Sequence, residues 1–306
     1  MALPRKAKGS KKIDEGLINI IAEYVKRGEC ILFLGAGAHY PPPKDSSYTY
    51  PEHQRPPLGS ALCEHLSVRS GLSEQPPKER KKISGLQRVS LYYETKRSRK
   101  ALVDEIRQMV GEGKTPSPVI RALARLNFPL VFTTNYDRLF EMALHDEKKA
   151  FNRRVYSKDR DTPTEDYLED PNPQQPIICK IHGDIGNPDS IVITDEDYIQ
   201  FVLRMGDPDI YHPVPETFRF YFKRWPTLFI GYSLMDYNLR LLFKTMRWKI
   251  DRAKVPDMYS VDLSPDPLIL DVWELQQKYV KFITQDVWSF VPMLYQKVTG
   301  EEFPPR

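Results

Sequence analysis

The sequence has few cysteines, and no two of them are spaced as metal ligands. Its three cysteines are Cys30, Cys63 and Cys179, and none belongs to a Cys-x-x-Cys pair. This spacing argues against a zinc ribbon and against a disulfide framework. We therefore expect no structural zinc and no other bound metal. Cys30 and Cys179 lie in or beside apolar stretches, where a small buried side chain is the expected interpretation.

Long apolar runs and a strong net charge are also missing. No run of about 18 apolar residues occurs, which argues against a membrane span. The basic N-terminus has no apolar stretch before a cleavage site, so it does not indicate a secretory signal, and we expect a cytoplasmic protein. The net charge of +4 is too small to indicate nucleic-acid binding by itself. We expect residues 1–12 to form a basic flexible, solvated arm. Two further charge clusters, near residues 78–82 and 96–100, flank an expected helix.

What is present is a globular composition with alternating apolar and helical patterns. The 306 residues, 41% of them hydrophobic, suffice for one large domain or two modest ones. The alternation predicts an α/β fold: a Rossmann-like parallel sheet with helices on both faces. Strands are expected at residues 30–34, 128–133, 177–181, 191–193, 225–231, 258–262 and 279–283. Helices are expected at residues 17–27, 58–68, 118–126, 136–144, 238–248 and 287–298. Residues 41–126 begin with a proline-rich span and predict a mostly helical insertion.

Three of the expected strands end in residues suited to chemistry. Ligands of open α/β sheets bind beyond the carboxyl ends of the strands. Asn135 and Asp137 follow one apolar strand, and His182 leaves another. Asn135 has an amide that can hold a ribose hydroxyl or a water, although an Asx turn that starts a helix would also use it. Asp137 would also favour a helix N-terminus. His182 at such a crevice is a candidate general base, although a lone histidine is more often structural.

A glycine pair follows the first strand. Gly35 and Gly37 would let backbone N–H groups approach a pyrophosphate. A tight strand-to-loop turn would need the same glycines. The dehydrogenase fingerprint requires a third glycine where this chain has Tyr40, and an acidic residue about 20 positions further on is also missing. The sequence therefore argues against a hydride-transfer domain.

Taken together, four motifs in this order resemble the sirtuin family, over roughly residues 17–285. They stand where that family has its NAD-binding glycines, its T-Q-N-I-D segment, its catalytic histidine and its G-T-S loop. The matching segments are Gly35-Ala36-Gly37, Thr133-Thr134-Asn135-Tyr136-Asp137, His182-Gly183 and Gly231-Tyr232-Ser233. The resemblance implies that residues 13–40 and 127–306 form a Rossmann-like NAD-binding domain.

The resemblance also implies a role for each matching residue. Asn135 and His182 would be catalytic. Asn135 would hold the nicotinamide ribose and the attacking water, and His182 would be the general base. The remaining positions would bind NAD+ as substrate, with Asp137 at the nicotinamide carboxamide and Asp262 at the adenine ribose. These NAD-binding positions are Gly35, Ala36, Gly37, Thr134, Asp137, Gly231, Ser233 and Asp262. Sirtuins usually have asparagine where this chain has Asp262.

Two departures separate this chain from zinc-dependent protein deacylases. It lacks their paired cysteines, and the G-I-P-D-F-R loop is replaced by residues 39–43. The chain is more similar to the prokaryotic sirtuin-like NAD hydrolases of anti-phage defence, whose stand-alone subunits pair with a HerA-like hexameric ATPase. This resemblance implies an NAD-depleting effector that works as a homo-oligomer. Tyr92, Tyr93 and Trp288 also suggest apolar faces beyond what one sheet needs.

Two alternatives stay open from the sequence. One is an NAD-dependent protein deacylase or ADP-ribosyltransferase. The other is a non-catalytic subunit of an ATPase complex that senses NAD or nucleic acid through the basic arm and the charge clusters at residues 78–82 and 96–100. Nucleic acid could also reach the chain through its partner.

Overall fold

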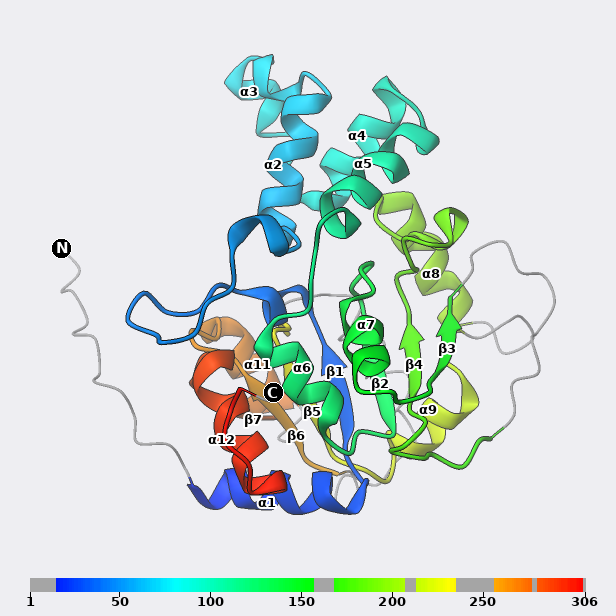
Figure 1. Ribbon diagram of the computed structural model, residues 1–306. Helices are drawn as coiled ribbons and strands as arrows, with labels where there is room; N and C mark the ends of the chain where they lie inside the picture. The colour runs from blue at the N-terminus through cyan, green and yellow to red at the C-terminus, as the bar shows by residue number, and fades with distance from the viewer. Residues whose placement is uncertain (1–14, 157–167, 207–212, 235–255, 277–279, 305–306) are drawn as a thin grey trace.

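The computed structural model describes residues 15–156, 168–206, 213–234, 256–276 and 280–304 (Figure 1). The predicted arm at residues 1–12 and the predicted helix at residues 238–248 lie outside these ranges. The described residues form a seven-stranded parallel sheet with the order β3-β4-β2-β1-β5-β6-β7. The strands are β1 (Ile31–Leu34), β2 (Leu130–Thr133), β3 (Asn152–Val155), β4 (Ile177–Lys180), β5 (Thr227–Ile230), β6 (Met258–Val261) and β7 (Val280–Ile283). The predicted α/β class with a parallel sheet is confirmed.

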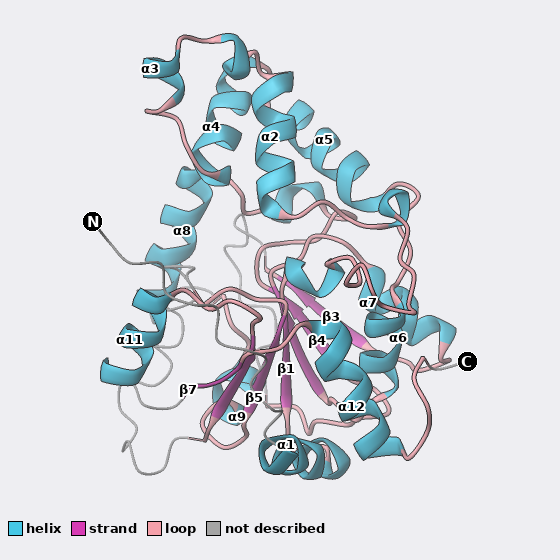
Figure 2. Ribbon diagram, turned by 90° about the vertical axis from the view of Figure 1, so that its left-hand side faces the viewer, coloured by secondary structure: helices cyan, strands magenta, loops and turns pink. Residues whose placement is uncertain are grey.

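Helices cover both faces of this sheet, because side chains alternate along each strand. On β1, Leu32 and Leu34 face one core, whereas Ile31 and Phe33 face the other. The first face packs against α1 (Glu15–Arg27), α6 (Pro118–Arg125), α7 (Leu139–Asp146) and α12 (Val287–Thr299). The second packs against α8 (Asp195–Gly206), α9 (Glu216–Tyr221) and α11 (Pro267–Gln276). Figure 2 shows α8 and α11 on one side of the strands, and α6, α7 and α12 on the other.

A separate group of helices stands above the carboxyl ends of the strands (Figure 1). It consists of α2 (Gly59–Arg69), α3 (Pro77–Arg80), α4 (Leu86–Lys96) and α5 (Arg99–Gly111). Its own core, which includes Leu66 and Ile106, also takes in Ile191 and Ile193 from the segment after β4. The chain enters this group from β1 and returns through α6 to β2, the neighbouring strand.

Two chain segments connect this helical group to the sheet, and they are joined to each other. The hydroxyl of Tyr50 donates to the carbonyl of Thr115 at 2.9 Å and to that of Gln54 at 3.3 Å. The backbone N–H of Thr115 donates to the Gln54 carbonyl at 3.1 Å. Lys114 Nζ reaches the carbonyl of His53 at 3.1 Å. We call residues 50–54 and 114–115, joined in this way, the two legs of the insertion.

Two local predictions differ from the structure, and one strand was not predicted. The strand predicted at residues 191–193 is wrong: this buried segment makes one backbone bond to the sheet side, from Val192 N to the His182 carbonyl. The Ile193 N–H is instead satisfied by Asp197 Oδ2. Helix α7 begins at Leu139 rather than at residue 136, because Asp137 Oδ1 accepts from Leu139 N. Strand β3 was not predicted, since a half-buried edge strand reading Asn-Arg-Arg-Val has no apolar run.

Candidate functional site

The carboxyl ends of β1 and β5 approach each other so closely that only glycine fits between them. Gly37 N donates to Gly231 O at 2.7 Å. Gly231 has a φ of +65°, and a Cβ placed there would lie 1.8 Å from Ala38 N. A Cβ on Gly35 would lie 2.5 Å from Gly231 O. The predicted glycines therefore have a structural task at this turn: they let the two loops meet at the point where the strand order reverses.

A cleft of about 1000 Å³ opens beside this contact. It is lined by every predicted site residue except Gly35, which lies behind the cleft against Gly231. The insertion supplies part of the wall, through Leu62 of α2, Leu86 of α4 and Val110 of α5. Tyr198 and His39, which we did not predict as site residues, also line it. The volume suits a ligand of dinucleotide size, because small-molecule sites commonly occupy about 300–1,000 Å³.

The loop after β2 is held by its own polar side chains. Thr133 Oγ1 donates to the Leu34 carbonyl at 3.0 Å and accepts from Asn135 N at 3.0 Å. Asp137 Oδ1 accepts from Leu139 N at 3.0 Å, and Asp137 Oδ2 lies 3.2 Å from His39 Nε2. Asp137 thus supports the start of helix α7, which is the structural role that the sequence allowed for it. The Asn135 side chain forms no turn of that kind and remains half-buried in the cleft wall.

Asp137 is buried yet disposed to be ionised. Burial alone would raise the pKa of its carboxyl. The neighbouring His39, the Lys180 ammonium and the Leu139 N–H together outweigh that effect, so the pKa of Asp137 lies below its ordinary value. A carboxylate at this position can accept hydrogen bonds from an amide or hydroxyl of a ligand.

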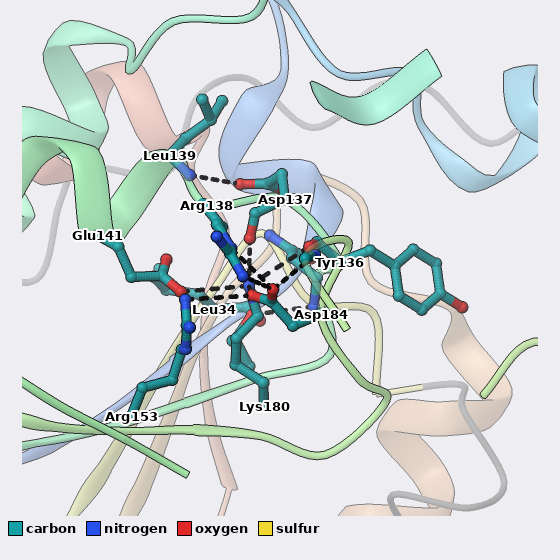
Figure 3. Close-up of polar contacts among 12 residues, drawn as sticks. Leu34, Tyr136, Asp137, Arg138, Leu139, Glu141, Arg153, Lys180 and Asp184 are labelled. Carbon is teal, nitrogen blue, oxygen red and sulfur yellow. Dashed lines mark hydrogen bonds and ion pairs between the residues drawn. The ribbon is translucent and has the colours of Figure 1, made fainter. Parts of the chain in front are cut away.

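A buried lysine supports the same loop from below (Figure 3). Lys180 is fully buried at the end of β4, and its Nζ donates to the Asp137 carbonyl and, at 3.4 Å, to that of Tyr136. The same ammonium lies 2.9 Å from Asp184 Oδ2 and 3.3 Å from Glu141 Oε1. Lys180 therefore joins the ends of β2 and β4, the two strands that carry Asn135 and His182.

Asp184 is the main counter-charge of this lysine. Burial opposes its ionisation, but Arg138, Lys180 and the Gly186 N–H stabilise the carboxylate and lower the pKa of Asp184 to about 2. Arg138 Nε donates to Asp184 Oδ1 at 2.7 Å. The pKa of Glu141 is raised, chiefly because burial disfavours its charge. Figure 3 shows these side chains converging under the loop that contains Asp137.

His182 lies where β4 ends and turns sharply. It is buried among aromatic rings: Tyr198 and Phe201 of α8 approach it edge to face at 5.1 and 5.8 Å. Its Nδ1 lies 3.4 Å from the Tyr198 hydroxyl. Gly183, with a φ of +91°, follows; a Cβ there would lie 2.2 Å from Ser190 O, so the turn requires glycine. The ring is thus fixed at the cleft by packing and by at least one polar contact.

The segment after His182 is attached to the insertion. Thr194 Oγ1 accepts from Asp197 N at 3.2 Å, and Asp197 Oδ2 accepts from Thr194 N at 3.1 Å, so the two side chains form a capping box at the start of α8. Arg99 of α5 pairs with Asp197 Oδ2 at 2.8 Å and donates to the Ile191 carbonyl. Arg88 of α4 also lies 3.8 Å from Asp195 Oδ2 of α8. Helix α8, which carries Tyr198 against His182, is therefore linked to the insertion by two arginines.

Within the described ranges, no group of three or more His, Cys, Asp or Glu side chains is arranged to hold a metal ion. No helix among the described residues is both long and apolar enough to cross a bilayer.

We did not predict four residues that line or support the cleft, although the sequence indicates a role for two of them. Lys180 interrupts the apolar run 177–181, and a charge within a buried strand must be paired. His39 stands only two positions beyond Gly37, at the same strand end as the glycines. Tyr198 and Arg99 come from helices whose packing no local pattern specifies.

An all-parallel sheet with a cleft at its switch point defines a Rossmann-like α/β protein. The family described as SIR2-like domain matches residues 129–283. The chain belongs to this SIR2-like family.

Several curated proteins are similar to it. NAD(+) hydrolase ThsA of Enterococcus faecium is 28% identical over 243 residues, covering 78% of this chain and 44% of that protein. NAD(+) hydrolase ThsA of Acinetobacter baumannii is 24% identical over 231 residues, covering 68% and 43%. Defense-associated sirtuin 2 of Bacillus subtilis is 23% identical over 158 residues, covering 51% and 14%. The chain thus spans less than half the length of these relatives.

Proposed function

We propose that this chain is an NAD+ glycohydrolase that releases nicotinamide and ADP-ribose, and that it depletes NAD+ as an effector of anti-phage defence. Membership in the SIR2-like family and similarity to proteins named NAD(+) hydrolase ThsA support the proposal. The single observation that carries it is the cleft at the switch point, where Asn135, Asp137 and His182 meet from two adjacent strand ends.

The chemistry suits such a site. The bond between the ribose C1′ and the pyridinium nitrogen breaks, and its electron pair leaves with a neutral nicotinamide, so no general acid is required. The ribose passes through an oxocarbenium-like state, as in glycoside hydrolysis. The water oxygen then forms the new bond to C1′ and loses a proton to a base. The protein must orient the ribose, hold the leaving group and take this proton.

We propose one of these tasks for each of the three side chains. In the tautomer whose Nδ1–H donates to the Tyr198 hydroxyl, Nε2 of His182 is the basic nitrogen that accepts the water proton. Asn135, half-buried in the wall, offers both a donor and an acceptor to the ribose and the water. Asp137, held as a carboxylate, accepts from the carboxamide N–H₂ of nicotinamide.

Nicotinamide release tests the proposal directly. The purified full chain is incubated with NAD+, alone and with a HerA-like ATPase and DNA, and the products are separated by chromatography. Nicotinamide and ADP-ribose in equal amounts are expected, and an Asn135→Ala variant should release little of either. Formation of acyl-ADP-ribose from an acetyl-lysine peptide would point to a deacylase instead. Binding of NAD+ without turnover under every condition would point to a sensing subunit.

The assembly and location of the protein are also proposals. We infer a homo-oligomer in the cytoplasm that is controlled by a HerA-like ATPase, with nucleic acid reaching the complex through that partner or through the basic arm. Tyr93 and Trp288, which suggested surplus apolar faces, are buried within the chain, so the inference depends on the resemblance alone. Light scattering at micromolar concentration that showed only monomers would contradict it.

A further inference from the structure

A second histidine lies at the cleft. His39 closes the short 3₁₀ turn Ala36–His39 after β1, and its side chain is 3% exposed. It lines the large cleft and also a small cavity of about 10 Å³ behind the Asn135 loop. That cavity is also bordered by Thr133, Asp137 and Glu141, and its size is that of about one water molecule.

The backbone on both sides of His39 is fixed. On one side, Gly37 N donates to Gly231 O at 2.7 Å, in the contact between β1 and β5. On the other, the Tyr40 carbonyl accepts from Trp288 Nε1 at 2.9 Å. A side chain on such a pinned turn has little freedom, so its position relative to the cleft is determined by the fold.

The imidazole contacts two of the residues assigned to chemistry. His39 Nε2 lies 3.2 Å from Asp137 Oδ2 and 3.5 Å from Asn135 Nδ2. Because Leu139 N already occupies Asp137 Oδ1, His39 is the side chain that holds the other carboxylate oxygen. His39 Nδ1 is buried and has no hydrogen-bond partner among the described residues. Buried polar atoms are nearly always paired, and exceptions gather at functional sites.

We propose that His39 is a positioning residue for the NAD+ substrate: its Nε2–H donates to Asp137 Oδ2 and holds this carboxylate beside Asn135 for the nicotinamide riboside end of the substrate, and its Nδ1 accepts a hydrogen bond from a substrate hydroxyl or a substrate-bound water. This inference depends on the function proposed above. It adds a group that none of the family motifs matched in the sequence contains.

The test uses a matched pair of histidines. His65 of the insertion pairs with Glu105 at 2.7 Å but does not line the cleft, so His65→Ala controls for loss of any histidine–carboxylate pair. The variants are His39→Ala, His39→Gln and His65→Ala in the full chain, with circular dichroism to establish folding. Glutamine can place an N–H where Nε2 lies, and therefore tests whether that contact alone is needed.

We expect His39→Ala to lower kcat/KM for nicotinamide release by up to about 100-fold, as misplacement of reacting groups does. His39→Gln should recover most of this loss, and His65→Ala should keep the wild-type kcat/KM per folded protein. Combined with Asp137→Asn, His39→Ala should add little, since the two side chains act as a unit. Near-wild-type kinetics for His39→Ala, or equal losses for His39→Ala and His65→Ala, would overturn the inference.

A binding measurement separates this outcome from failure of the proposed function. NAD+ binding is followed by calorimetry in a His182→Ala background, where turnover does not interfere. Weaker binding with His39→Ala than with His65→Ala supports the inference even if the wild type releases no nicotinamide, in which case only hydrolysis fails. A wild type that neither binds nor hydrolyses NAD+ overturns both.

Discussion

Two histidine–carboxylate pairs occupy different regions of the molecule and differ in how fully they are satisfied. In the insertion, His65 and Glu105 lie 2.7 Å apart, with side chains 29% and 10% exposed. At the cleft, His39 and Asp137 lie 3.2 Å apart, with side chains 3% and 8% exposed. The first pair is short and near water, and the second is longer and removed from it.

The difference shows which pair belongs to a stabilising cluster. Glu105 accepts from His65 on one oxygen, and from Arg69 at 2.8 and 2.9 Å and Tyr93 at 3.4 Å on the other. Around Asp137, by contrast, the buried His39 Nδ1 is left without a partner among the described residues. A satisfied cluster contributes to stability, whereas an incompletely satisfied one beside a cleft is typical of a site that completes its bonds with a ligand.

The largest expected effect is a loss of activity when cleft residues are replaced, with no such loss in the insertion. Asn135→Ala and His182→Ala should each lower nicotinamide release by about 10²–10⁴-fold, as expected for loss of a positioning group or a general base. Glu105→Gln in the insertion should leave kcat unchanged per folded protein. The double variant at the cleft should be scarcely worse than the poorer single one. Folded Asn135→Ala and His182→Ala proteins that keep near-wild-type release would place the chemistry elsewhere.

The second effect compares a buried cation with an exposed one by stability. Lys180→Met leaves Asp184, which is fully buried, without its closest lysine, and should lower the free energy of unfolding by about 3–5 kcal/mol. Arg69→Met removes a 60% exposed partner of Glu105 and should cost about 1 kcal/mol or less. Urea unfolding followed by fluorescence measures both. Equal losses would show that burial does not distinguish the two clusters.

The third effect is the acid sensitivity of the network under the cleft. Because the folded-state pKa of Asp184 is about 2, below its ordinary value of 3.8, its carboxylate stabilises the fold above about pH 4, and this contribution disappears as the pH falls towards about 2. Asp184→Asn should therefore be about 2–3 kcal/mol less stable at pH 7. By pH 3 the gap from wild type should shrink by about half. A gap that stays constant from pH 7 to pH 3 would contradict the assignment.

The smallest expected effect concerns the orientation of His182. Tyr198→Phe removes one hydroxyl contact to Nδ1 and keeps the edge-to-face packing of the ring. A single neutral hydrogen bond is worth about 1 kcal/mol, so kcat should fall by about fivefold. The pH profile of kcat should shift as well, because the hydroxyl can donate to or accept from the ring nitrogen that it contacts. An unchanged profile would mean that packing alone orients the ring.

The sequence predicted those parts of the fold that depend on local patterns. Apolar runs located β1, β2, β4 and β5, since strands of a parallel sheet are buried on both faces. The edge strand β3 was not predicted because Arg153 and Arg154 leave it without an apolar run. Residues 191–193 were mistaken for a strand because the burial of Ile191 and Ile193 arises from the insertion core, a contact that local hydrophobicity does not encode.

For the candidate site, strand-end polar residues were predictable and their supports were not. The cleft brings together Asn135, Asp137 and His182, as the order of strand ends implied. Their roles in binding NAD+ stay predictions. The bonds from Lys180 to the loop carbonyls and from Arg99 to Asp197 join elements that are distant in the sequence. Such pairings depend on the three-dimensional packing of whole helices and strands.

The paired legs of the insertion have a mechanical consequence. Because Tyr50 ties residues 54 and 115 together, the helices above the sheet are carried on one narrow stem and not on two independent connections. A narrow stem limits movement of these helices away from the sheet more than it limits sideways movement. Contacts farther from the stem therefore determine their sideways position. Arg99 and Arg88 make such contacts, because they pair with Asp197 and Asp195 at the start of α8, the helix whose Tyr198 contacts His182. Sideways movement of the helices above the sheet would therefore reach the edge of the cleft that carries His182 through these ion pairs and through the packing of Ile191 and Ile193.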